Sequence, residues 1–139
     1  MKAIFLPGNK KVELRAVEVP KPGPEEALVQ VKASCICRSD LSLYYGNAVV
    51  GGEAAGKCIT GHEPAGIVTE VGDAVTEFKP GDRVAVYLGV GCGVCTYCRQ
   101  GIYFLCKKWT CLGFTANGGN AEYLAVPARN LLKIPDWMS

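Results

Sequence analysis

The stretch Gly91-Cys92-Gly93-Val94-Cys95-Thr96-Tyr97-Cys98, followed by Cys106, is the part of the sequence that decides the fold. Its cysteines have the spacing C-x2-C-x2-C-x7-C. Four thiolates on one short loop are the ligand set of a closed tetrahedral zinc site, and the interspersed glycines allow the backbone to bend around an ion. We therefore predict a structural zinc lobe over about residues 89–112, with the ligands Cys92, Cys95, Cys98 and Cys106.

Other interpretations of these cysteines are buried or disulfide-paired side chains, and an iron site or iron–sulfur cluster. Three cysteines at a constant spacing followed by a fourth favour a metal site, and composition alone does not separate zinc from iron. Eight cysteines would also suit a secreted disulfide scaffold, but their clustering favours metal binding in a reducing compartment. The N-terminus lacks the pattern of a signal peptide. We expect a cytoplasmic protein.

Length and composition limit the number of domains and the kinds of partner that this protein can have. The chain has 139 residues, which predicts one domain, with 49% hydrophobic and 20% charged residues as in globular proteins. The net charge is +2 and the basic residues are scattered, so we expect no nucleic-acid partner. No apolar stretch reaches transmembrane length, so we expect no membrane partner.

Short segments with strand-like patterns alternate with turn residues along the chain. A helix is expected to begin at Ser39-Asp40, a loop covers Gly46 to Gly56, and Lys79-Pro80-Gly81-Asp82 has the pattern of a type II turn. Many short strands with little helix predict an all-β barrel or sandwich with minor helix. The expected strands are 3–6, 12–19, 27–33, 65–71, 83–87, 121–126 and 131–134.

Side-chain patterns also predict which residues are buried. In the segment 27–33, we expect Val29, Val31 and Ala33 to share one face, and Leu28, Gln30 and Lys32 the other. Three aromatic residues are expected to pack in the core rather than line a substrate cleft: Phe104, Trp109 and Phe114. No role is assigned to Cys35, Cys58 and Cys111, because buried thiols usually behave as small hydrophobes.

The only histidine, His62, lies just before an expected strand, and Cys37 lies at the end of another. A single histidine is more often structural than a metal ligand. However, a thiolate and an imidazole from two strand ends can converge on one metal ion. A catalytic zinc ion needs three protein ligands and an open position, and Glu63 is a candidate for the third ligand or for a group beside the ion.

The chain resembles the N-terminal, GroES-like catalytic domain of the zinc-dependent medium-chain alcohol dehydrogenases. The resemblance spans almost the whole chain, and the order and spacing of the motifs make it specific. The motifs are Cys37-Arg38-Ser39-Asp40, Gly61-His62-Glu63-Pro64-Ala65-Gly66, Gly81-Asp82-Arg83-Val84, the cysteines at 92–106 and, more weakly, Gly119-Asn120-Ala121-Glu122-Tyr123. The implied fold is a partly open β-barrel with a cysteine-rich zinc lobe.

The resemblance implies that Cys37 and His62 are catalytic zinc ligands and that Glu63 is the acidic residue behind that zinc. The four lobe cysteines match the structural zinc site. Asp40 matches the carboxylate that orients the ligand histidine, although an aspartate here could also cap a helix.

The implied reaction is hydride transfer from a zinc-polarised small alcohol to NAD or NADP, or the reverse with a carbonyl substrate. Ser39 matches the hydroxyl that takes the alcohol's proton, and Arg38 matches a position whose guanidinium reaches the cofactor pyrophosphate. Many relatives have a histidine where this chain has Ser42, so water or the cofactor ribose would have to complete the proton relay. The sequence does not determine whether the protein forms homo-oligomers.

Family members continue into a dinucleotide-binding domain with a Gly-x-Gly-x-x-Gly turn and the third catalytic zinc ligand, and no segment here matches it. We therefore expect residues 1–139 to form the GroES-like catalytic domain alone, inactive in isolation. The alternative is a non-enzymatic zinc-binding structural or interaction module derived from the same family. A small cysteine-rich nucleic-acid binder is disfavoured by the scattered charge.

Overall fold

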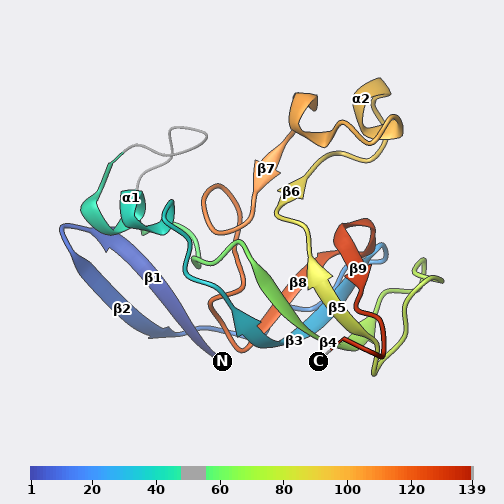
Figure 1. Ribbon diagram of the computed structural model, residues 1–139, viewed down its shortest axis with the longest axis horizontal. Helices are drawn as coiled ribbons and strands as arrows, with labels where there is room; N and C mark the ends of the chain where they lie inside the picture. Colours follow the sequence, from blue (N-terminus) through green and yellow to red (C-terminus); the bar gives the residue numbers. More distant parts are fainter. Residues whose placement is uncertain (48–55, 139) are drawn as a thin grey trace.

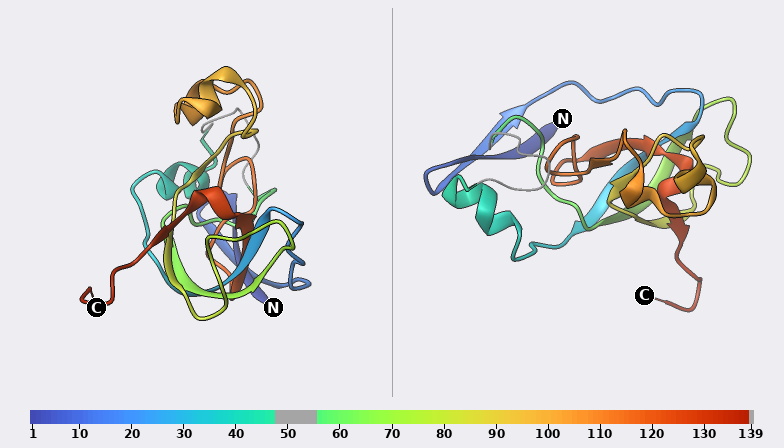
Figure 2. Two further views of the ribbon diagram at one scale, coloured as in Figure 1. Left: turned by 90° about the vertical axis from the view of Figure 1, so that its right-hand side faces the viewer. Right: turned by 90° about the horizontal axis from the view of Figure 1, so that it is seen from above.

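Five antiparallel strands form the central sheet, in the order β8-β3-β4-β5-β9. The computed structural model describes residues 1–47 and 56–138. Figures 1 and 2 show that this sheet curls into a half-barrel. Its strands are β3 (Glu26–Ser34), β4 (Pro64–Val71), β5 (Arg83–Val86), β8 (Tyr123–Pro127) and β9 (Leu131–Lys133).

A hairpin of β1 (Lys2–Gly8) and β2 (Lys11–Ala16) extends the barrel. A bridge between Ala3 and Ala121 joins it to the rest of the chain. In addition, the backbone N–H of Ile4 donates to Asn120 O, and the backbone N–H of Thr60 donates to Ile4 O. The helix α1 (Asp40–Tyr45) lies against β1 and ends at Gly46, which has the left-handed conformation (φ 82°) that terminates many helices. The barrel is thus partly open, as predicted.

The main core lies inside the curled sheet. Its centre consists of valines that alternate along neighbouring strands, which is the pattern expected of strands with one buried face. Burial of each such side chain contributes about 1.5–3 kcal/mol. The fully buried valines are Val29, Val68, Val84 and Val126. This rigid sheet carries the loops described below at its strand ends.

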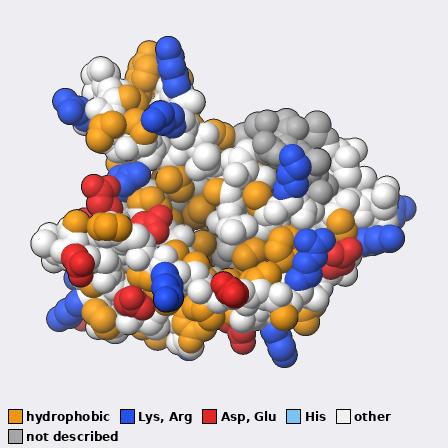
Figure 3. All heavy atoms as spheres, turned by 180° about the vertical axis from the view of Figure 1, so that it is seen from behind, with side chains coloured by type: hydrophobic (Ala, Val, Ile, Leu, Met, Phe, Trp, Pro, Cys, Tyr) orange, Lys and Arg blue, Asp and Glu red, His pale blue; other side chains and the backbone are white. Residues whose placement is uncertain are grey.

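The cysteine-rich lobe projects from the barrel on two very short paired strands, β6 (Gly89–Val90) and β7 (Thr110–Cys111). Between them lie α2 (Thr96–Arg99) and a 3-10 turn, η2 (Tyr103–Leu105). Figure 3 shows Lys and Arg side chains on this projecting part. A second 3-10 turn, η3 (Ala128–Asn130), connects β8 to β9 beside the base of the lobe.

The predicted strands are confirmed, with shifted ends. β2 ends at Ala16 rather than Val19, because its partner strand begins at Lys2, which pairs with Ala16. Residue 121 makes only the isolated bridge to Ala3, so β8 begins at Tyr123. The type II turn is supported by Gly81 (φ 95°) and by the hydrogen bond from Asp82 N to Lys79 O.

Two predictions of burial are wrong. In β3, Leu28 is buried beside Val29 and Ala33 is exposed, because bulges at Leu28/Val29 and Val31/Ala33 interrupt the alternation. Phe104 is 67% exposed on the lobe, whereas Phe114 is buried as expected. Residues 48–55 of the loop expected at Gly46 to Gly56 lie outside the described residues. Within the described part of the chain, every helix is too short to cross a membrane.

Candidate functional site

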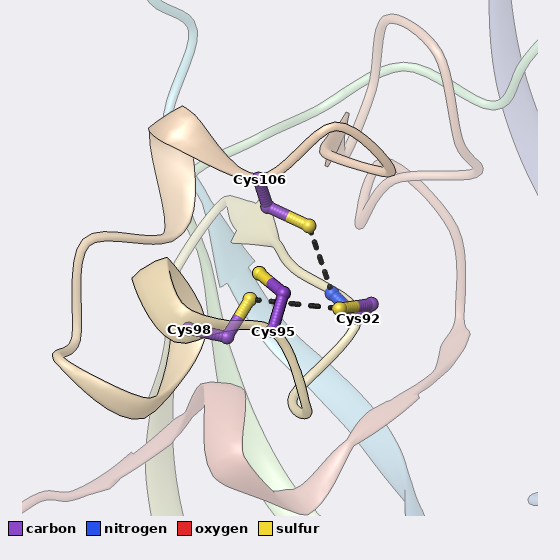
Figure 4. A group of neighbouring side chains, drawn as sticks. All are labelled: Cys92, Cys95, Cys98 and Cys106. Carbon is purple, nitrogen blue, oxygen red and sulfur yellow. Dashed lines mark hydrogen bonds between the residues drawn. The ribbon is translucent and has the colours of Figure 1, made fainter.

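The structure brings together the four cysteines of the lobe. Their sulfur atoms all lie within 4.8 Å of one another, and the Sγ atoms of Cys92 and Cys98 are 3.9 Å apart. Figure 4 shows the four side chains converging on one point. A tetrahedral zinc ion with Zn–S bonds near 2.3 Å separates its sulfurs by about 3.8 Å. The Cys92–Cys98 separation is close to that value, and the four sulfurs together form a cluster of the size that holds one ion.

Local structure explains how this short segment gathers four thiols. Cys95 precedes α2 in an extended conformation, and α2 then carries Cys98 back toward it. Gly91 is required here, because a Cβ at that position would lie 2.6 Å from the sulfur of Cys98. The Sγ of Cys106 accepts hydrogen bonds from the backbone N–H groups of Cys92 (3.4 Å) and Lys108 (3.3 Å).

These surroundings prepare some of the thiols to ionise and oppose the ionisation of another. Backbone N–H groups of Val94 and Cys95 lower the pKa of Cys92 to about 6. The N–H of Cys92 lowers the pKa of Cys106 below its usual range. Burial raises the pKa of Cys98 to about 11. A cation bound to the four sulfurs would therefore be needed to hold Cys98 as a thiolate near neutral pH.

A second cluster consists of Cys37, His62 and Glu63, whose ligand atoms also lie within 4.8 Å of one another. Nε2 of His62 lies 3.1 Å from Ser39 Oγ and 4.0 Å from Glu63 Oε1, so this nitrogen faces the shared position. The His62 side chain is 6% exposed, whereas the Glu63 side chain is 45% exposed. The cluster offers one sulfur, one nitrogen and one carboxylate oxygen, which is a donor set that suits zinc.

Asp40 connects Cys37 and His62, the two less exposed members of this cluster. Its Oδ2 accepts a hydrogen bond from the backbone N–H of Cys37 at 2.8 Å, and its Oδ1 lies 3.6 Å from His62 Nδ1. Asp40 is the first residue of α1, and the residue at the cap position is Ser39, which makes no capping hydrogen bond. A carboxylate facing Nδ1 favours the tautomer with its proton there, leaving Nε2 free to bind a metal ion.

The loop that carries His62 is held by close packing of backbone on backbone. Gly119 N donates to Gly61 O, and a Cβ on Gly118 would lie 2.0 Å from that same oxygen. The ring of Phe114 lies against the imidazole, with ring centroids 4.8 Å apart. Sequence reasoning placed Phe114 in the core but missed this contact. The paired glycines at 118 and 119 were the available signal that another backbone approaches closely.

The remaining predicted residues lie outside the two clusters. Arg38 is exposed beside the second cluster, and its role toward a cofactor stays a prediction. Cys111 is 1% exposed, and burial raises the pKa of its thiol to about 11, as expected of a cysteine that packs as a hydrophobe.

Comparison with known proteins agrees with this geometry. The family described as "Alcohol dehydrogenase GroES-like domain" matches residues 23–136. The Escherichia coli "Uncharacterized zinc-type alcohol dehydrogenase-like protein YphC" is 40% identical over 100% of this chain and 41% of its own length. L-threonine 3-dehydrogenase of Pyrococcus horikoshii is 42% identical over 88% of this chain and 35% of its own length.

Among solved structures, the cobalt- and zinc-bound thermostable alcohol dehydrogenase of Pyrobaculum aerophilum is 35% identical. It superposes with a TM-score of 0.83, covering 99% of this chain and 42% of that one. The chain thus spans about two fifths of the length of the proteins it matches. The family match, the curled half-barrel and the two clusters lead to one conclusion: this chain belongs to the family of alcohol dehydrogenase GroES-like domains.

Proposed function

We propose that this chain is the catalytic-domain portion of a zinc-dependent NAD(P) alcohol or polyol dehydrogenase. The observation that carries the proposal is the second cluster. Its three potential ligand atoms lie within 4.8 Å, and the hydroxyl of Ser39 lies 3.1 Å from the imidazole nitrogen that faces the same position. A proton acceptor beside a metal site is what alcohol oxidation requires.

In this proposal Cys37 and His62 hold the catalytic zinc, with Glu63 as third ligand or immediate neighbour. When bound, zinc polarises the alcohol oxygen as a Lewis acid, and the nicotinamide exchanges a hydride with the carbinol carbon. Asp40 fixes the orientation of His62, and the ring of Phe114 packs against the imidazole. Both Asp40 and His62 are buried, so water competes little for the contact between them.

The protein's own residues would move the substrate proton. Ser39 Oγ would accept the proton of the alcohol. In the described part of the chain, no side-chain hydrogen bond links Ser39 to the half-buried Ser42, whose backbone N–H donates to Ser39 O at 3.1 Å. The proton would therefore pass from Ser39 to water or to the cofactor ribose. The exposed guanidinium of Arg38 would bind the cofactor pyrophosphate, and the rest of the cofactor site would lie in a dinucleotide-binding domain outside this chain.

The relatives support a small alcohol or the corresponding carbonyl compound as the substrate class, and L-threonine is one example among the alcohols that they oxidise. We further propose the cytoplasm as the location, because thiols that bind zinc must stay reduced. The four lobe cysteines would hold a second zinc ion that orders the lobe.

Metal analysis of the 139-residue chain tests this proposal directly. We expect two zinc ions per wild-type chain, and one in each of the variants Cys37→Ser and His62→Ala. In the cobalt-substituted wild type, the visible spectrum should change when a primary alcohol is added, and this change should be absent in Cys37→Ser. One zinc ion in the wild type, unchanged in both variants, would place the metal in the lobe and contradict the proposal that Cys37 and His62 hold zinc in this chain.

A further inference from the structure

Two side chains of η3 hold the base of the cysteine lobe. Asn130 is 3% exposed, and its Nδ2 donates to the carbonyl oxygens of Tyr87 and Gly89, each at 2.9 Å. Arg129 reaches further along the same segment, and its Nη2 donates to Gly91 O at 2.8 Å. Both residues come from the barrel, so the barrel contacts the lobe at the residue before its first cysteine.

The contact of Arg129 differs from that of Asn130 because of the peptide group involved. The carbonyl of Gly91 and the N–H of Cys92 belong to one planar unit, so fixing the first fixes the direction of the second. That N–H donates to the sulfur of Cys106 at 3.4 Å, as the dashed line in Figure 4 shows. Arg129 therefore lies one peptide plane away from a hydrogen bond to a zinc-binding sulfur.

The position of the guanidinium adds an electrostatic effect. Four thiolates around one Zn²⁺ have a net charge of about −2, and the lobe sequence 89–112 contains no acidic residue. The guanidinium lies close to the backbone between Cys92 and Cys95, where its Cζ would be 3.3 Å from a Cβ on Gly93. Its side chain is 29% exposed, so water only partly screens this charge.

We propose that Arg129 is a positioning residue for the metal of the lobe. It aims the Cys92 N–H at the sulfur of Cys106 and places a positive charge beside the thiolates, which slows the loss of the ion. This inference rests on the zinc proposed for the four cysteines. Groups that hydrogen-bond or orient metal ligands typically change metal affinity 10- to 100-fold when they are removed.

The test compares variants of the 139-residue chain loaded with zinc, with release measured by a chromogenic chelator in excess. We expect Arg129→Met, which removes the donor and the charge, to release lobe zinc about tenfold faster than wild type. Arg129→Lys keeps the charge and should fall between them. Glu25→Gln is the matched control, because Glu25 contacts the other side of the guanidinium at 3.6 Å, and its rate should stay within about twofold.

The cobalt-substituted proteins separate positioning from general loosening of the lobe. We expect Arg129→Met to shift the sulfur-to-cobalt charge-transfer band, because the hydrogen bond to Cys106 is altered. Asn130→Ala breaks contacts at Tyr87 and Gly89 only, so it should lower the melting temperature and leave the band in place.

Two results would overturn the inference while leaving the zinc lobe intact: equal release rates in wild type and both Arg129 variants, or equal band shifts in Arg129→Met and Asn130→Ala. If the wild-type lobe cysteines bind no metal, the proposed zinc lobe itself fails, and the inference fails with it.

Discussion

The carboxylate of Asp40 and the imidazole of His62 form a buried pair, with 3.6 Å between Oδ1 and Nδ1. Among the described residues, neither of these two atoms has a hydrogen-bond partner elsewhere. A small closing movement would turn this contact into a hydrogen bond from Nδ1–H to the carboxylate, and it would leave Nε2 as the only nitrogen available to a metal ion. The other carboxylate oxygen holds the backbone of Cys37. One side chain thus orients two candidate ligands.

This pairing predicts a selective loss of metal in Asp40→Asn. The amide lacks the charge that favours the required tautomer of His62, so we expect affinity at the Cys37–His62 site to fall about 10- to 100-fold. Zinc in the cysteine lobe should be retained. Zinc per chain, measured after dialysis against graded chelator concentrations, checks this. Asp136→Asn, at an exposed position, is the control, and a second zinc ion held equally well by Asp40→Asn would contradict the prediction.

Close backbone packing near His62 predicts a large effect of Gly118→Ala. Its Cβ would lie 2.0 Å from Gly61 O and 2.7 Å from the Cα of Gly113, so the loop carrying His62 must shift. We expect the free energy of unfolding to fall by about 2–3 kcal/mol, measured by urea denaturation. In Gly101→Ala the new Cβ meets no atom within 4 Å, and the only strain comes from the left-handed backbone (φ 75°). This strain should lower the free energy of unfolding by about 1 kcal/mol. Equal losses in the two variants would refute the packing argument.

The turn before β5 predicts a pH dependence of stability. The backbone N–H of Lys79 donates to Asp82 at 3.0 Å and, with Lys133 at 3.2 Å, lowers the pKa of that carboxyl. Because the folded-state pKa is below the unfolded value, the stabilisation is complete above the ordinary aspartate pKa, near 4. It is lost as the pH falls through the lower, folded-state value.

Urea denaturation from about pH 7 down to about pH 2 checks this. Asp82→Asn should be less stable than wild type near neutrality, and the difference should shrink in acid. Asp136 is exposed and lines the same surface hollow as Asp82. In Asp136→Asn, the difference in stability from wild type should not change with pH. A difference between wild type and Asp82→Asn that stays constant with pH would count against the ionised carboxylate.

The unequal thiols of the lobe predict selective alkylation after zinc is stripped by a chelator. Near pH 7, iodoacetamide should label Cys92 faster than Cys98, because thiolate is the reactive form and the two pKa values are about 6 and about 11. Labelling of Cys92 should decline as the pH falls through about 6. Peptide mass spectrometry measures both rates, and zinc-loaded protein should be protected at both positions. Similar rates in the stripped protein would contradict the prediction.

Much of the fold and the cysteine cluster of the lobe could be predicted from sequence, since they depend on short-range patterns, whereas the ligand roles of Cys37 and His62 were expected from the resemblance to a family. Turn residues such as Pro80-Gly81 delimit the strands, and the cysteine spacing confines four thiols to one loop. The burial of Leu28 could not be predicted in this way, because a bulge in β3 depends on its partner strand.

The contact between Phe114 and His62 and the bond from Arg129 to Gly91 were also inaccessible to these patterns. Each joins residues far apart in the sequence, and packing of the folded chain brings them together. The role of Asp40 could be expected only from the resemblance to a family, because an aspartate at the start of a helix is ordinarily explained by local capping.

The paired strands β6 and β7 have a further consequence. Gly89 pairs with Cys111 and Val90 with Thr110, so the chain leaves the barrel and returns to it at adjacent points. Everything between Val90 and Thr110 can be regarded as an insertion into a hairpin. A tight two-residue connection could replace it without changing the order of the strands in the barrel. The lobe can therefore be gained, enlarged or lost in evolution as one continuous insertion, independently of the Cys37–His62 site.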